Sequence, residues 1–156
     1  MCIRDRYCTL IMSDQKDLGF VYKKEILNRS ANPGFSEPIS NPDKIIKGLN
    51  PFCGDEVIFN MNIHKNKISS IYLEVEGCAV HKSSSSILSE IILDEQINEI
   101  EALCNEFISY FKNDSNNSIN PKLLLANPLF DIKNNQIRIK CALLSWNTIY
   151  NNLFKT

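Results

Sequence analysis

Three cysteines and one aspartate are the side chains of this sequence best suited to bind a metal ion. Cys53 lies in NPFCGD with Asp55 two residues later, Cys78 follows Gly77 in EGCAV, and Cys141 lies in RIKCALLSW. Three thiolates and a carboxylate suit a tetrahedral zinc ion or an iron–sulfur cluster. The spacing differs from a pair of CxxC motifs, so a purely structural role for each cysteine also stays open.

A predicted hairpin would bring two of these cysteines together. Residues 56–63 and 67–77 alternate apolar and polar side chains, which predicts two half-buried strands joined by a turn at 65–66. Cys53 and Cys78 are equidistant from that turn, so we expect their thiols side by side at the open end of the hairpin. The Asp55 carboxylate can face the same point, and Gly54 eases the bend between them.

Helical periodicity governs most of the remaining chain. A short first helix is expected to end before Asn32-Pro33-Gly34, and residues 33–51, with four prolines, are predicted to be loop. Ser83–Ser86 offer N-caps for the next helix, whose amide dipoles favour a thiolate at Cys78.

Two amphipathic helices are predicted in the second half of the chain. Residues 97–111 carry one apolar stripe, and residues 139–153 carry another. If the last helix packs on the open end of the hairpin, Cys141 completes the set of three thiols and one carboxylate. We therefore expect an α+β fold with a small, hairpin-based antiparallel sheet of about three strands packed against several helices.

The other reactive side chains have simpler interpretations. We expect Cys104 to be a small buried apolar residue of the helix over 97–111. His81, three residues after Cys78, is interpreted as a surface residue at a helix start rather than a ligand. Arg138 and Lys140 flank Cys141 and would ordinarily be solvated charges.

Length and charge exclude several classes of function. The 156 residues suit one domain, which we place at 13–156, with 1–12 as a disordered tail or a non-native upstream extension. A net charge of −1 argues against nucleic acid as a partner. The sequence offers no apolar run of about 18 residues and no signal-peptide pattern, so we expect a cytoplasmic protein with no membrane segment.

Three motifs in order resemble a known family. NPFCGD, EGCAVHKSSSSILSE and RIKCALLSW are similar to the U-type scaffolds of iron–sulfur cluster assembly, the family of IscU, SufU and the NifU N-terminal domain. The SufU branch fits best, because Lys140 precedes the last cysteine where the IscU branch has a histidine. The long gap between Cys78 and Cys141 also suits the insertion of that branch.

The resemblance implies a site and a partner. The implied zinc ligands are Cys53, Asp55, Cys78 and Cys141, with Cys53 accepting persulfide sulfur from a SufS-type, pyridoxal-phosphate-dependent cysteine desulfurase. Arg138 resembles a family position at the interface with that partner. Downstream iron–sulfur assembly proteins would then receive the cargo.

Three functions remain compatible with the same ligands. The first is a zinc-bound sulfur acceptor and carrier, a sulfurtransferase-type protein that acts with a desulfurase rather than as a stand-alone enzyme. The second is a scaffold that assembles a nascent [2Fe–2S] or [4Fe–4S] cluster. The third is a domain in which zinc only supports folding.

Overall fold

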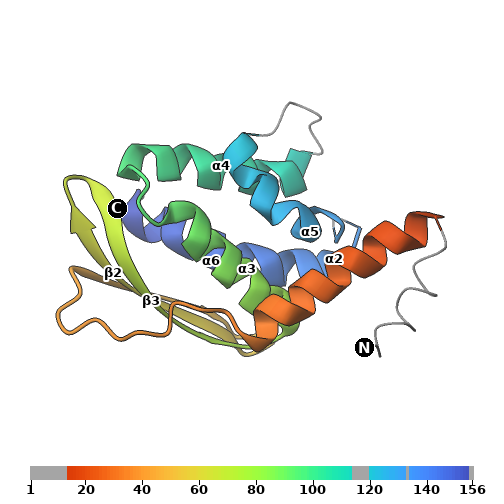
Figure 1. The fold of residues 1–156 in the computed structure, drawn as a ribbon, viewed down its shortest axis with the longest axis horizontal. Coiled ribbons are helices and arrows are strands. Elements are labelled where there is room, and N and C mark those ends of the chain that lie inside the picture. The colour runs from red at the N-terminus through yellow and green to blue at the C-terminus, as the bar shows by residue number, and fades with distance from the viewer. Residues whose placement is uncertain (1–13, 114–119, 133, 155–156) are drawn as a thin grey trace, which may run out of the picture.

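The computed structural model describes residues 14–113, 120–132 and 134–154. Over these residues the chain forms a three-stranded antiparallel sheet with its helices packed on one face (Figure 1). The expected α+β class is confirmed. The predicted tail at 1–12 lies outside the described residues. Among the described helices, none is both long and apolar enough to cross a membrane.

The elements follow one another in a simple order. They are α2 (Asp14–Ala31), β1 (Lys44–Asn50), β2 (Asp55–His64), β3 (Lys67–Glu76), α3 (Ala79–Ile92), α4 (Ile97–Asn113), the 3-10 helix η1 (Pro121–Ala126), α5 (Asn127–Phe130) and α6 (Gln136–Leu153).

The central hairpin forms as predicted, but its register changes along its length. Lys65 and Asn66 adopt positive φ values of 51° and 64°, and His64 pairs with Lys67 across the turn. A bulge between Asn62 and Ile63 then shifts every later pair by one residue, so that Glu56 pairs with Glu76. Extending this register places Asp55 opposite Gly77, and it places Gly54, rather than Cys53, opposite Cys78. A bulge adds an unpaired residue on one strand, which residue counting from the turn cannot detect.

The prediction that residues 33–51 are loop is wrong for their last part. Residues 44–50 form β1, which pairs antiparallel with β2 from Lys44–Met61 to Asn50–Asp55. Ile45 and Ile46 are adjacent apolar residues, so apolar and polar residues do not alternate in this sequence, although Ile45 is exposed and Ile46 is buried. The strand is therefore specified by pairing with β2 rather than by its own pattern.

The prediction that Ser83–Ser86 cap a helix is also wrong. Helix α3 begins at Ala79, with Cys78 as its N-cap, and all four serines are buried within it. Their hydroxyls donate to main-chain carbonyls: Ser84 reaches Ala142 on α6 at 2.6 Å, and Ser86 reaches Pro33 at 2.7 Å. Small hydroxyl side chains that bond to main chain let α3 pack closely on its neighbours.

Helix α6 passes through the centre of the helical layer. Trp146 is fully buried, stacks on Phe107 of α4 with ring centroids 3.8 Å apart, and donates from Nε1 to Ser84 Oγ at 3.0 Å. Cys104, also on α4, is fully buried as predicted, and burial raises its pKa to about 12. The core therefore fixes α6 against α3 and α4, which sets the position of its first turns.

Candidate metal centre

Cys53 lies at the tip of the hairpin that joins β1 to β2. Asn50 and Asp55 are its last strand pair, and the Gly54 N–H donates to the Asn50 carbonyl at 2.8 Å. The Asn50 side chain closes the turn from inside, because its Oδ1 accepts from the Phe52 N–H at 3.0 Å. Gly54 has a φ of 76°, a conformation that glycine adopts without strain. The tip holds its backbone fixed while the Cys53 side chain is exposed.

Asp55 is buried beside the end of β3. Its Oδ1 accepts from the Cys78 N–H at 3.1 Å, and the Cys78 Sγ lies 3.9 Å from its Oδ2. Gly77 makes this approach possible, because a Cβ at Gly77 would overlap the Asp55 carboxylate. Gly77 also has a φ of 139°. The carboxylate is therefore held against the main chain that carries the second cysteine.

Cys78 caps the N-terminus of α3. Its sulfur accepts from the His81 N–H at 3.5 Å, one of the main-chain donors that the first turn of a helix leaves without an intrahelical partner. The expectation that Cys78 precedes a helix start is confirmed, with the helix beginning four residues earlier than predicted.

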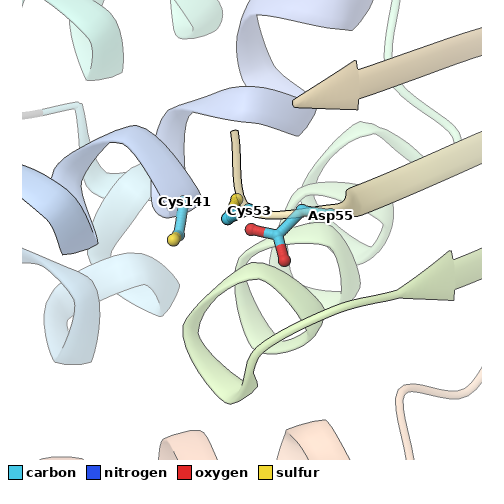
Figure 2. Close-up of side chains that lie close together, drawn as sticks. All are labelled: Cys53, Asp55 and Cys141. Carbon is cyan, nitrogen blue, oxygen red and sulfur yellow. The ribbon is translucent and has the colours of Figure 1, made fainter. Parts of the chain in front are cut away.

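Cys141 reaches the same point from the first half of α6 (Figure 2). Ligand atoms of Cys53, Asp55 and Cys141 all lie within 4.8 Å of one another. Cys78 is outside that group of three, but it lines the same cavity of about 440 Å³ together with them. Three separate chain segments thus converge with the four predicted ligands around one cavity.

The electrostatics of the cavity favour a cation. Burial raises the pKa of the Cys141 thiol well above its usual range, and the neighbouring Cys78 and Asp55 raise it further. Three thiols and a carboxylate are therefore gathered around one cavity, and Arg138 is the cationic side chain among the residues that line it. Three thiols and a carboxylate match the ligands that zinc prefers. The ligand atoms of one tetrahedral zinc lie roughly 3.5 to 4 Å apart, so small side-chain rotations would bring these four groups to that spacing.

His81 is not the surface residue that the sequence predicted. It is fully buried, and its Nε2 lies 2.9 Å from the Glu56 carbonyl oxygen. A carbonyl oxygen accepts only, so Nε2 carries the proton and donates, while Nδ1 has no hydrogen-bond partner among the described residues. His81 thus ties α3 to β2 one residue beyond Asp55, and its ring is committed to the main chain rather than to the cavity.

Arg138 lies at the rim of the cavity. It is exposed on the first turn of α6, where its N–H donates to the capping Asn135 side chain at 3.1 Å. It lines both the cysteine cavity and a neighbouring cavity of about 330 Å³ formed with Leu27 and Val80. Its placement next to Cys141 agrees with the sequence, and its role stays a prediction.

Two supporting residues were missed in the sequence. Asn50 closes the tip that carries Cys53, and Gly77 makes room for Asp55. An Asn-Pro pair at a strand end is a recognisable side-chain turn signal. For Gly77, the requirement for a missing side chain appears only once β3 is placed against Asp55.

Comparison with known proteins decides the family. Residues 21–121 match the family described as NifU-like N-terminal domain. The chain belongs to this family. The predicted membership of the IscU, SufU and NifU group is confirmed. Cys141 lies beyond the matched residues 21–121. Its place beside Cys53 and Asp55 is therefore known from the fold rather than from the family match.

Relatives named for both branches are similar to this chain over most of its length. The iron–sulfur cluster assembly scaffold protein IscU of Thermotoga maritima is 28% identical over 83% of this chain and 89% of its own length. The zinc-dependent sulfurtransferase SufU of Bacillus subtilis is 25% identical over 88% and 92%. A crystal structure described as an iron–sulfur scaffold of the SUF system from Fervidobacterium islandicum superposes with a TM-score of 0.71 at 26% identity, covering 90% of this chain and 94% of that one.

Proposed function

We propose that this chain is a SufU-type sulfur acceptor, which binds zinc through Cys53, Asp55, Cys78 and Cys141 and receives persulfide sulfur from a SufS-type cysteine desulfurase in the cytoplasm. One observation carries the proposal. Cys53 is exposed at a hairpin tip, while Asp55 and Cys141, within 4.8 Å of it, are buried. Cys53 is thus the donor most accessible to a partner protein, whereas Cys78 is half-buried and the other two are buried.

This asymmetry assigns different tasks to the ligands. Asp55 and Cys141 are buried residues of β2 and α6, so they could keep a metal ion in place while another ligand leaves. Cys53 is on the exposed tip and can turn toward an incoming partner. Zinc, when bound, would hold the thiols as thiolates and offset their mutual repulsion.

The transfer step balances without an added oxidant. The Cys53 thiolate attacks the terminal sulfur of the donor's cysteine persulfide, and a sulfur–sulfur bond forms at Cys53. The donor's own sulfur–sulfur bond breaks, and its cysteine leaves as a thiolate. Cys53 ends as a persulfide, from which downstream iron–sulfur assembly proteins would take the sulfur.

A second candidate is a scaffold for a nascent iron–sulfur cluster on the same ligands. It is favoured by the three sulfur donors around one cavity and by similarity to a relative named as a scaffold. The cluster would then be the cargo rather than a resident cofactor. Metal analysis of freshly purified protein separates the two: stoichiometric zinc without visible charge-transfer bands supports the acceptor, and a stable coloured cluster supports the scaffold.

The decisive experiment measures sulfide release by a SufS-type desulfurase in the presence of this chain. We expect the wild type to stimulate release and Cys53→Ala to abolish the stimulation. Cys104→Ala, a cysteine substitution in the core away from the cavity, is the matched control and should stimulate like the wild type. Stimulation by Cys53→Ala would refute the acceptor role, and unfolding of Cys53→Ala would instead indicate a purely structural zinc site.

A further inference from the structure

Two of the exposed apolar side chains of the described residues belong to the segments that form the cysteine site. Six large hydrophobic side chains are exposed among the described residues: Leu27, Ile45, Leu49, Phe52, Leu124 and Ile137. The two most exposed are Phe52 at 96% and Ile137 at 72%. Phe52 precedes Cys53 on the hairpin tip, and Ile137 lines the cavity from the first turn of α6.

Single exposed apolar residues are ordinary, but this arrangement is different. Phe52 and Ile137 stand on two different segments, the hairpin tip that carries Cys53 and the first turn of α6, which lines the cavity with Cys53. Transfer of a phenylalanine side chain from water to an apolar environment is favourable by about 1.5 to 3 kcal/mol. Folding does not gain this free energy at Phe52, because the side chain stays exposed. A protein that covered Phe52 would recover that free energy.

The backbone around Phe52 is arranged in advance. The Phe52 N–H donates to Asn50 Oδ1, the Gly54 N–H donates to the Asn50 carbonyl, and Pro51 restricts the backbone that leads into Phe52. Presenting an aromatic ring from a fixed turn lowers the entropy lost on association. Aromatic side chains and arginine are also the residues that most often dominate binding energy at interfaces, and Arg138 follows Ile137 at this rim.

We propose that Phe52 and Ile137 are the apolar anchors by which this protein docks onto its persulfide donor, with the Phe52 ring entering an apolar hollow beside the donor's persulfide-bearing cysteine. This inference rests on the proposed function. The occupant follows from the transfer chemistry: the donor's sulfur must reach bonding distance of the Cys53 Sγ, so the donor surface must also cover the residue next to Cys53. The neighbouring cavity lined by Leu27 and Val80 continues this surface beyond Arg138.

The test compares zinc-loaded full-length variants as acceptors for a SufS-type cysteine desulfurase. We expect Phe52→Ala to raise the half-saturating acceptor concentration about tenfold, while the rate at saturation stays within about twofold. The dissociation constant measured by calorimetry should rise by the same factor, with zinc content unchanged. Ile137→Ala should act in the same direction with a smaller effect.

Ile45→Ala is the matched control. Ile45 is 56% exposed on β1, five residues before Asn50 at the end of that strand and so roughly 17 Å from it along the strand. It should bind and stimulate like the wild type. The anchor proposal is overturned if Phe52→Ala keeps the wild-type half-saturation and dissociation constant, if it lowers only the saturating rate, or if Ile45→Ala weakens binding equally.

Failure of this proposal can be told apart from failure of the proposed function. If the wild type stimulates the desulfurase and Phe52→Ala does so equally well, the acceptor role is supported and the anchor proposal is refuted. If the wild type neither binds nor stimulates the desulfurase, the acceptor role itself falls, and the anchor proposal falls with it.

Discussion

The two halves of helix α6 lie in opposite surroundings. Its first turns carry Ile137, Arg138 and Cys141 at the open cysteine cavity, whereas Trp146, five residues beyond Cys141, is fully buried against Phe107 and Ser84. The buried half is held by close packing and a hydrogen bond. The cavity is shaped by a fixed turn, a glycine and a few main-chain hydrogen bonds. Stability and reactivity are therefore placed in separate regions of one helix, and substitutions should separate them.

The largest effect is expected in the buried half. Trp146→Ala removes the stack on Phe107 and the hydrogen bond to Ser84, and should lower the free energy of unfolding by about 3 to 5 kcal/mol. Urea denaturation measures this loss. Trp146→Phe keeps an aromatic ring and should lose less. A cost below about 1 kcal/mol for Trp146→Ala would contradict the view that this half carries the stability.

The next effect should appear at Gly77. A Cβ there would overlap the Asp55 carboxylate, so Gly77→Ala should weaken zinc binding at least about tenfold, as measured by competition with a chromophoric chelator. Gly34→Ala is the control, because Gly34 also has a positive φ, of 78°, but open space around it. Both variants should lose about 1 to 2 kcal/mol of stability to backbone strain. Equal zinc affinities of the two variants would show that Asp55 does not need the space left by the missing side chain of Gly77.

A third effect concerns the buried thiol of Cys104. Its pKa is about 12 in the folded protein against an ordinary 9.0, so folding favours the protonated form. The resulting stability is complete below pH 9 and is lost as pH rises from 9 toward 12, because the unfolded chain then holds fewer protons. The stability difference between wild type and Cys104→Ala should shrink by about 1.4 kcal/mol per pH unit above 9. A difference independent of pH would show that the thiol is not desolvated.

The smallest effect on stability is expected at Cys53. Its side chain is exposed at the tip, so Cys53→Ala should change the free energy of unfolding of the metal-free protein by less than about 0.5 kcal/mol. In the metal-free wild type a thiol reagent should modify Cys53 first and reach Cys104 only on unfolding. Slow labelling of Cys53 would show that the tip is covered and would weaken the contrast between the two regions.

Local patterns in the sequence predicted much of the fold. The alternation over 56–63 and 67–77 and the helical stripes over 97–111 and 139–153 correspond to β2, β3, α4 and α6. Strand β1 was missed because Ile45 and Ile46 are adjacent and its pairing with β2 lies in no local pattern. The start of α3 and the burial of His81 were missed because four serines and a histidine look polar in sequence. Their hydrogen bonds to main chain, from α3 to α6, Pro33 and Glu56, are contacts across the fold.

The sequence by itself determined the kinds of ligand, the membership of the family and the central hairpin, because residue types and short-range periodicity are local properties. Only the tertiary structure decided how the ligands differ. The bulge between Asn62 and Ile63 sets Asp55 against Gly77, and the packing of Trp146 places Cys141 in the cavity. The tip of the β1–β2 hairpin leaves Cys53 and Phe52 exposed. These outcomes depend on register and on packing between segments far apart in the chain, which no window of sequence contains.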